Sequence, residues 1–228
     1  MEENSQILSL DDQTLSLDDY EFVIKCIYSN YKEYCKSWHS IKSGRMNLKS
    51  KQIRDVYNSS CGIDNRFLDY MHTFKYGLTS FYRKILLELD DSIDITDKTE
   101  FTGRVKSEES IRNKIYIKSK DQHGKFPINK CLNDLLGLRI IDKDYKNNIN
   151  ILEKKILWFK EQGYIINNIH RDTKEGYKGY HIYFKDSNEA FPIELQIWDS
   201  ENEKKNRELH VPYKQNYVKD IIKDYNKF

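Results

Sequence analysis

Polar and charged side chains recur every four residues in the stretch GRVKSEESIRNK, residues 103–114. On a helix, Lys106, Ser110 and Lys114 would form one polar stripe. Cations and a hydroxyl near a helix N-terminus can hold a polyphosphate, because the free N–H groups and the helix dipole already favour an anion there. Lysine and glutamate at such spacings also occur on ordinary exposed helices, so a solvated helix face is the alternative.

Two carboxylates accompany apolar strand patterns. Asp134 directly precedes LLGLRII, an apolar run that carries Arg139. Glu194 and Gln196 alternate with apolar residues and therefore share one face of a strand. Two acids on neighbouring strands can share a Mg²⁺ ion, which takes one or two protein carboxylates and completes its shell with water and phosphate oxygens. The alternatives are a structural ion pair between Asp134 and Arg139, and solvation of Glu194 and Gln196 at a sheet edge.

A glycine-containing loop, KEGYKGYH at residues 174–181, precedes another strand pattern. The loop is expected to expose the ring of Tyr177, which can stack on a nucleic-acid base. A tyrosine in such a loop also serves in packing or in a hairpin turn, and His181 would then be a hydrogen-bonded core histidine.

The N-terminal part of the chain, residues 1–100, is predicted to be mostly helical. Ser16 and Asp19 resemble a capping box, followed by apolar residues at helical spacing to about Lys36. Apolar residues from Phe67 to Leu89 predict a second long amphipathic helix.

From residue 101 the apolar period changes to that of strands. The predicted strands are LGLRIID, YIINNIHRD, GYHIYFKD and FPIELQIWD. Asn147–Gln162 is predicted to be a helix that stops at Gly163, and Tyr217–Phe228 a weak final helix. The pattern predicts an α+β fold with a mixed sheet flanked by helices. Since no Pro-, Gly- or Ser-rich linker intervenes, we expect the helical region 1–100 and the region 101–228 to pack as one unit.

Composition excludes several classes of protein. The 228 residues include 38 Lys and Arg against 36 Asp and Glu, which argues against a purely electrostatic binding protein. No apolar run reaches the roughly 20 residues of a membrane span, and the acidic start MEENSQILSLDDQ is unlike a signal peptide. The 4 scattered cysteines favour reduced thiols over a disulfide frame or a zinc site, and hence a cytoplasmic protein.

Taken together, GRVKSEESIRNKI, NDLLGLRII, EGYKGYHI and IELQIW resemble the successive motifs of the RelA/SpoT-like (p)ppGpp synthetase domain, in family order and spacing. The resemblance covers about Phe101 to Lys214. It implies a nucleotidyltransferase-like mixed sheet and a pyrophosphokinase. Such an enzyme transfers the β,γ-pyrophosphate of ATP to a ribose 3′-hydroxyl and releases AMP, with Mg²⁺ as cofactor.

The resemblance also implies roles for individual residues. The ATP-binding residues would be Arg104, Lys106, Ser110, Lys114 and Arg139. The two arginines would sandwich the adenine, and the other three would line the triphosphate. Asp134 and Glu194 would be the catalytic and metal-binding residues, and Glu194 would also orient or deprotonate the attacking hydroxyl.

On the acceptor side, the resemblance implies that Tyr177 stacks on the acceptor base and that His181 and Gln196 make polar contacts. A closing segment would contain His210, Tyr213 and Lys214. The chain departs from the family pattern at three positions: Gly179 stands where serine is common, Trp198 where arginine is common, and Leu209 where glutamate is usual. If that arginine normally holds the 5′-phosphates of GDP or GTP, its loss weakens their binding by about 1.5–3 kcal/mol.

The long helical N-terminal segment resembles that of toxic small alarmone synthetases. Some of these pyrophosphorylate the 3′ CCA end of tRNA, inhibit translation and are neutralised by an antitoxin. We therefore expect the acceptor end of tRNA as the favoured acceptor and a protein antitoxin as a candidate partner. The alternatives are synthesis of (p)ppGpp or (p)ppApp from guanosine or adenosine nucleotides, and an inactive nucleotide- or RNA-binding sensor. Against a sensor, both carboxylates and both phosphate-facing lysines are present.

Overall fold

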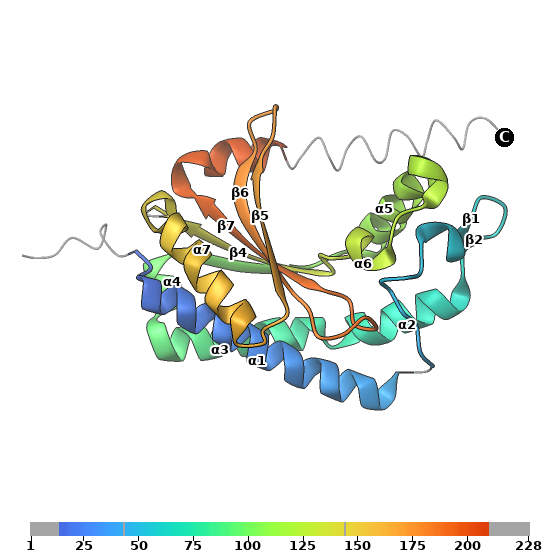
Figure 1. Cartoon of the computed structure of the whole chain (residues 1–228), viewed down its shortest axis with the longest axis horizontal. Coiled ribbons are helices and arrows are strands. Elements are labelled where there is room, and N and C mark those ends of the chain that lie inside the picture. Colours follow the sequence, from blue (N-terminus) through green and yellow to red (C-terminus); the bar gives the residue numbers. More distant parts are fainter. Residues whose placement is uncertain (1–13, 43, 144, 210–228) are drawn as a thin grey trace, which may run out of the picture.

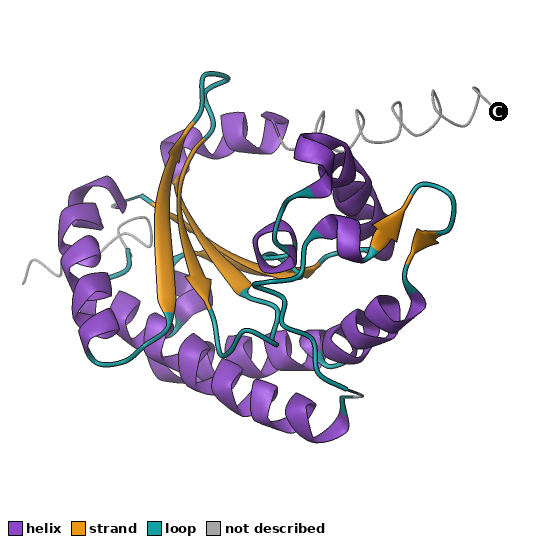
Figure 2. Cartoon of the chain, turned by 45° about the vertical axis from the view of Figure 1, so that its right-hand side comes forward, coloured by secondary structure: helices purple, strands orange, loops and turns teal. Residues whose placement is uncertain are grey.

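The computed structural model describes residues 14–42, 44–143 and 145–209. A five-stranded sheet of order β3-β4-β7-β6-β5 forms its centre. The strands are β3 (Glu100–Val105), β4 (Leu136–Asp142), β5 (Ile166–Asp172), β6 (Lys178–Phe184) and β7 (Ile193–Asp199). β4 and β7 run parallel and the other neighbours are antiparallel. The mixed sheet confirms the predicted α+β class, and Figure 2 shows its twist among the surrounding helices.

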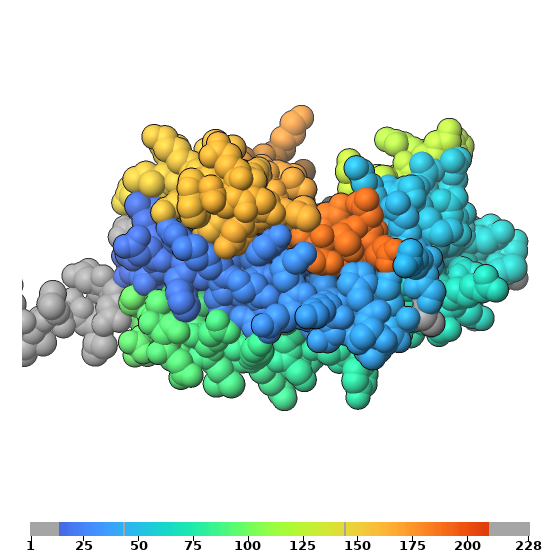
Figure 3. All heavy atoms as spheres, turned by 60° about the horizontal axis from the view of Figure 1, so that its bottom comes forward, coloured from blue at the N-terminus to red at the C-terminus, as the bar shows by residue number. Residues whose placement is uncertain are grey.

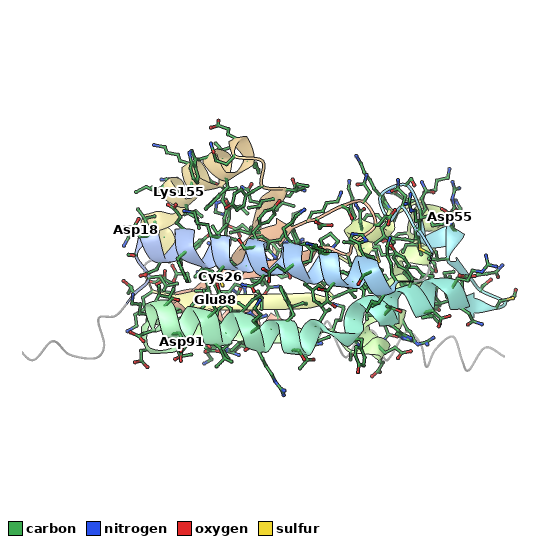
Figure 4. All side chains as sticks on the ribbon, turned by 90° about the horizontal axis from the view of Figure 1, so that it is seen from below. Asp18, Cys26, Asp55, Glu88, Asp91 and Lys155 are labelled. Atoms are coloured by element: carbon green, nitrogen blue, oxygen red, sulfur yellow. The ribbon has the colours of Figure 1, made fainter. Side chains whose placement is uncertain are left out.

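Four helices form the layer against one face of this sheet (Figure 1). They are α1 (Leu17–Ile41), α2 (Asn65–Tyr76), α3 (Leu78–Ile93) and α7 (Tyr145–Glu161). Seen from below, α1 lies between α7 and α3 (Figure 3). In Figure 4, Lys155 of α7 and Glu88 of α3 lie on opposite sides of α1. This layer buries one side of the sheet and leaves the other side to the remaining elements.

The remaining elements are short, apart from one helix. They are the helices α4 (Ile95–Lys98), α5 (Glu108–Lys120) and α6 (Ile128–Cys131), the 3₁₀ turns η2 (Ile53–Asp55) and η3 (Asp121–Gly124), and the ribbon β1 (Tyr57–Asn58) with β2 (Gly62–Ile63). Residues 200–209 are also helical. α5 and this last helix rise on the far side of the sheet from α1 and α3 (Figure 1). None of the described helices has the length and apolarity that a membrane crossing requires.

The start of α1 follows from its sequence. The Ser16 hydroxyl accepts the Asp19 N–H at 3.1 Å, and the Asp19 carboxylate accepts the Ser16 N–H at 2.9 Å, which confirms the capping box. The apolar residues that follow are buried at helical spacing. The helix ends at Ile41, beyond the predicted end near Lys36.

The prediction of one long helix from Phe67 to Leu89 was wrong, because Gly77 divides the segment into α2 and α3. A Cβ atom at Gly77 would lie 2.9 Å from Cε2 of Tyr34, a residue of α1. The Tyr34 hydroxyl donates to the carbonyl of Phe74 in the last turn of α2. The apolar stripe continues across the break, so its periodicity alone does not reveal where the chain bends.

The N-terminal helices and the sheet share one hydrophobic core. The Tyr31 hydroxyl donates to the Phe191 carbonyl at 2.7 Å, and the Tyr20 hydroxyl to the Asp142 carboxylate at 2.5 Å. The rings of Phe74 and Phe191 lie 5.2 Å apart. Because these contacts join α1 and α2 to the sheet and its loops, the helices cover an apolar face that would otherwise contact water.

The later elements agree with the predicted strands and differ at one place. β4, β5, β6 and β7 coincide with the four predicted strand segments, and α7 with the predicted helix that precedes Gly163. β3 was not predicted as a strand. The helix expected over the first motif begins only at Glu108, with Ser107 as its N-cap. The helix predicted at Tyr217–Phe228 lies outside the described residues.

Candidate active site

One face of the sheet carries the polar residues singled out in the sequence. Cross-strand pairing aligns Arg104, Gly137 and Glu194 in one row. The next row contains Thr102, Arg139, Gln196 and His181. Residues two apart in a strand point to the same side, so both rows lie on the face opposite to the α1–α3 layer. The sheet therefore brings five of the predicted site residues onto one surface.

Asp134 lies in the turn before β4 and binds both predicted phosphate-lining lysines. The Lys106 Nζ atom is 2.7 Å from one carboxylate oxygen, and the Lys114 Nζ atom is 3.0 Å from the other. Asp134 therefore pairs with these two lysines, whereas Arg139, the partner in the alternative interpretation, donates to Gln196. Two ammonium groups on one carboxylate leave a positive charge, which suits an incoming polyphosphate.

The single helical stripe predicted for the three donor residues was wrong in one respect. Lys106 precedes α5, and only Ser110 and Lys114 lie on that helix. The Lys106 N–H donates to the Leu135 carbonyl at 2.8 Å, which brings the segment after β3 beside the turn that holds Asp134. The Ser107 hydroxyl donates to the Ser110 hydroxyl at 2.8 Å in the first helical turn. Tertiary pairing, not helical spacing, brings the two lysines together.

Glu194 is nearly buried, with 5% of its surface exposed, and both of its oxygens are engaged. The His181 Nδ1 atom is 2.7 Å from one oxygen, and Gln196 Nε2 donates to the other at 2.7 Å. Burial by itself raises the pKa of Glu194, but the hydrogen bond and the electrostatic attraction of His181, together with Tyr183 and Gln196, outweigh burial and lower the pKa to about 2. β7 lies between β4 and β6, so solvation at a sheet edge does not explain Glu194.

Tyr177 is half-buried, and the expectation of an exposed ring was wrong. Its hydroxyl lies 2.7 Å from the His181 Nε2 atom and accepts the indole N–H of Trp198 at 3.0 Å. The Tyr177 and Trp198 rings meet edge to face at 6.0 Å. Burial raises the pKa of Tyr177 to about 12, so the hydroxyl keeps its proton at neutral pH.

The two predicted adenine-binding arginines have different surroundings. Arg139 lies over the Trp198 ring, with Cζ 3.5 Å from the ring centroid, and donates to the Gln196 side-chain oxygen at 3.0 and 3.2 Å. Arg104 is exposed on β3, paired with Gly137. Both side chains lie on the same face, but the Arg139 guanidinium is directed toward β7. The sandwich of an adenine between the two arginines stays a prediction.

Sequence reasoning missed two residues of this network. Arg171 of β5 donates to the Tyr183 hydroxyl at 2.9 Å, and Tyr183 of β6 pairs in register with Glu194 and helps to lower its pKa. Tyr183 follows His181 by two residues, so strand alternation was a signal that could have found it. Arg171 becomes a neighbour only through the pairing of β5 with β6. His210, Tyr213 and Lys214, the predicted closing segment, lie outside the described residues.

The donor chemistry of the polar face fits a magnesium ion. Asp134 and Glu194 supply hard carboxylate oxygens, and Mg²⁺ needs only one or two such ligands beside phosphates and water. Gly137 leaves open space next to Glu194, since a Cβ atom there would lie 3.9 Å from Oε2 and meet nothing nearer. The described residues contain no group of three His, Cys, Asp or Glu side chains that could form an all-protein metal site.

Comparison with known proteins places the chain in a family. A family model described as "Region found in RelA / SpoT proteins" matches residues 103–218. A GTP pyrophosphokinase family protein from Streptococcus pneumoniae is 23% identical, covering 67% of this chain and 75% of that chain with a TM-score of 0.40. The small alarmone synthetase 1 from Bacillus subtilis is 24% identical, covering 68% and 79% with a TM-score of 0.39. Neither likeness bears on the substrate of this chain.

A search of the curated proteins found no match. The family match therefore carries the assignment. It spans about half of the chain, from the end of β3 past β7, and includes the lysines around Asp134 and the network around Glu194. The chain belongs to the RelA/SpoT family and is a pyrophosphotransferase enzyme.

Proposed function

We propose that the enzyme transfers the β,γ-pyrophosphate of ATP to the 3′-hydroxyl of the CCA end of tRNA and releases AMP. The consequence is inhibition of translation, as expected of the toxin of a toxin–antitoxin system. The observation that carries the choice of acceptor is the environment of Trp198. This indole is fully buried against Tyr177 and Arg139 on the acceptor side of the polar face.

The donor side supports the binding of a triphosphate. Lys106 and Lys114 are partly exposed, with 19% and 24% of their side chains accessible, and their only anchor among the described residues is Asp134. Phosphate oxygens carry more charge than one carboxylate, so the two ammonium groups turn toward a bound triphosphate. This movement releases the Asp134 oxygens. The exposed Arg104 guanidinium is available to stack on the adenine.

Asp134 and Glu194 are the residues that would hold Mg²⁺, which when bound neutralises the charge of the phosphates. Asp134 is close to the lysines, and Glu194 pairs in register with Gly137, three residues after Asp134 in the chain. The two carboxylates therefore approach the phosphates from the start of β4 and from β7.

Glu194 is suited to orienting the acceptor hydroxyl. Its lowered pKa makes it a weak proton acceptor, so it holds the 3′-hydroxyl by a hydrogen bond and receives the proton only late in the reaction. The 3′-oxygen forms a bond to the β-phosphorus while the bond from that phosphorus to the α–β bridging oxygen breaks, and AMP leaves. Such loose phosphoryl-transfer transition states depend mostly on positioning and charge neutralisation.

The acceptor side favours a polynucleotide end over a free nucleotide. The family pattern has arginine at position 198, and if that arginine holds the 5′-phosphates of GDP or GTP, the uncharged indole of Trp198 cannot replace it. Arg139 is already engaged with Trp198 and Gln196. The 3′-terminal adenosine of tRNA is joined through a diester and needs no clamp for a 5′-polyphosphate. Stacking on Tyr177 and contacts along the RNA backbone are sufficient to hold it.

The N-terminal helices are proposed to belong to the same working unit. Residues 1–100 supply α1, α2 and α3, and Tyr20 and Tyr31 hydrogen-bond directly to the region that follows. These contacts lie on the apolar side of the sheet and leave the polar side free for the substrates.

The acceptor is identified by a labelling experiment. The enzyme is incubated with γ-labelled ATP and Mg²⁺, and with either tRNA, GDP, GTP or ADP. We expect label on tRNA, release of AMP and little label on the free nucleotides. The matched control is the same tRNA ending in 3′-deoxyadenosine, which stacks equally well but lacks the attacking hydroxyl.

The outcomes separate the candidate functions. Label on GDP or GTP with none on tRNA would replace the proposal by alarmone synthesis, and label on ADP by synthesis of adenosine alarmones. Binding of ATP without transfer to any acceptor would indicate a sensor. In cells, expression of the wild-type chain should stop translation, whereas expression of Glu194→Gln at the same level should not.

A further inference from the structure

We propose that Trp198, the Tyr177 hydroxyl and His181 form a hydrogen-bond chain with a single direction that positions the Glu194 carboxylate. Trp198 and Tyr177 act on Glu194 through His181 and are therefore positioning residues. The inference deepens the proposed function, since it concerns the same site, but it is tested without any substrate.

The two ends of the chain determine its direction. The Trp198 indole N–H can only donate, and the ionised Glu194 carboxylate can only accept. The three heavy-atom distances along the chain are 3.0 Å from Trp198 to Tyr177, 2.7 Å from Tyr177 to His181 and 2.7 Å from His181 to Glu194. Each lies within the range of a hydrogen bond.

The direction requires one tautomer of His181. Its Nδ1 atom faces the carboxylate and must carry the proton, so a neutral ring leaves a lone pair on Nε2. That lone pair accepts the O–H of Tyr177, whose oxygen in turn accepts the Trp198 N–H. Every link then pairs one donor with one acceptor, with the His181 proton on Nδ1.

Burial protects Trp198, His181 and Glu194 from competition by water, and Tyr177 between them is half-buried. The exposed surface of His181 is 4% and that of Trp198 is 0%. In such surroundings hydrogen bonds are stronger and polarise one another, so the orientation of one group is transmitted to the next. The other Glu194 oxygen is held by Gln196. The carboxylate is consequently fixed at both oxygens before any substrate binds.

Gly179 and Arg139 hold the indole at the head of the chain. A Cβ atom at Gly179 would lie 3.0 Å from Trp198 Cδ1 and 3.0 Å from the Tyr177 hydroxyl oxygen. A larger residue there would separate the two partners, so the indole reaches Tyr177 only because position 179 has no side chain. Arg139 stacks on the indole and restricts its rotation. Gly179 and Trp198 therefore depend on each other.

Tyr177 thus has two separable roles. Its ring face serves the acceptor base under the proposed function, and its hydroxyl serves Glu194 through His181. Tyr177→Phe retains the face and removes the hydroxyl. Trp198→Phe retains an aromatic ring and removes the N–H. Neither change alters a group that would contact ATP.

The chain is tested by NMR on the full-length protein labelled with ¹⁵N in its histidine rings, without nucleotide. His181→Asn assigns the His181 signals by their loss. We expect the wild-type spectrum to show a proton on Nδ1 and a hydrogen-bonded lone pair on Nε2. In Tyr177→Phe the Nε2 signal should move to the position of a lone pair without a donor. Trp198→Phe should move it less, in the same direction.

Tyr180→Phe is the matched control. Tyr180 is a fully buried tyrosine next to His181 in the chain, but strand alternation directs it to the opposite face of the sheet. Its loss should leave both His181 nitrogen signals unchanged. Gly179→Ser should reproduce the effect of Trp198→Phe, because the added side chain displaces the indole.

Kinetics with the acceptor that the labelling experiment identifies give a second readout. Tyr177→Phe should lower kcat about tenfold, the effect of one lost hydrogen bond, and leave the KM values for ATP and for the acceptor unchanged. Trp198→Phe should lower kcat about threefold. A purely structural role would lower kcat only in proportion to the folded fraction, which circular dichroism measures, and would leave the His181 nitrogen signals of the folded protein unchanged.

The proposal is overturned if wild-type His181 carries its proton on Nε2 or on both nitrogens, or if Tyr177→Phe leaves the Nε2 signal in place. If Tyr177→Phe does not fold, the tautomer of His181 in the wild-type protein and the Nε2 signal in Trp198→Phe still test the proposal. A failure of the proposed acceptor shows only in the labelling experiment, because the NMR measurement contains no substrate. The expected tautomer together with label on GDP would remove the tRNA assignment and leave the chain intact.

Discussion

The two faces of the central sheet differ although they are made from the same strands. On β7, Ile193, Leu195 and Ile197 point to one face and are fully buried in the core. The residues that alternate with them, Glu194, Gln196 and Trp198, point to the other face and form the polar network. Strand alternation therefore separates the side chains that stabilise the fold from those that do chemistry, and a substitution can address one face without the other.

The polar face itself contains two unlike halves. Around Asp134 the side chains are long, charged and partly exposed, and their ion pairs are replaceable by a ligand. Around Glu194 they are buried and hydrogen-bonded to one another. A partly exposed, charged half suits a substrate that brings its own charge, whereas a buried, hydrogen-bonded half suits the orientation of one hydroxyl.

The largest effect is expected from the two carboxylates. Asp134→Asn or Glu194→Gln should lower transfer by about 10³-fold or more, since each removes charge where the phosphates react. Circular dichroism should show a folded protein in both cases. Turnover within tenfold of wild type in either variant would contradict the assignment of the polar face as the active site.

Substitutions at two adjacent residues of β7, one on each face, compare the two faces of the sheet directly. Ile197→Ala should lower the free energy of unfolding by about 2–5 kcal/mol, because it leaves a cavity in the core. Gln196→Ala should change unfolding less and transfer more, because its amide holds Glu194. Urea unfolding and initial rates measured on both variants give the comparison. The reverse ranking would mean that the two faces are not functionally separate.

The polar face should also be the acid-sensitive one. The pKa of Glu194 is lowered in the folded protein, so the unfolded chain binds the proton first and folding loses stability as pH falls from 4.5 to about 2. The loss is on the order of 3 kcal/mol in wild type, and Glu194→Gln should lack it. Urea unfolding at a series of pH values measures the difference. Parallel pH curves for the two proteins would assign the acid sensitivity to other groups.

The smallest effect is expected at the acceptor base. Tyr177→Ala should weaken use of the acceptor by about 1–3 kcal/mol in kcat/KM, the value of one stacked base, beyond the effect of Tyr177→Phe. ATP binding should be unchanged, because Tyr177 lies in the half around Glu194 and the triphosphate site in the partly exposed half around Asp134. An equal loss of ATP affinity, measured by calorimetry, would show that the halves are coupled.

Elements with strong local signals were predictable. The capping box at Ser16, the alternation in β4 to β7 and the apolar stripe of α7 are properties of neighbouring residues, and each element formed where expected. The break at Gly77 and strand β3 were not predicted. The first depends on Tyr34, which is distant in sequence, and the second on pairing with β4.

The sequence by itself determined which residue types are available for the chemistry: two carboxylates, a set of lysines and arginines, and Tyr177 in a loop before a strand. Only the tertiary structure decided their partners. The register of β6 and β7 placed His181 between Tyr177 and Glu194, and close packing placed the Trp198 indole over Gly179. The reason is physical: periodicity assigns a side chain to a face, but a hydrogen bond requires distances of about 3 Å that only the packed chain determines.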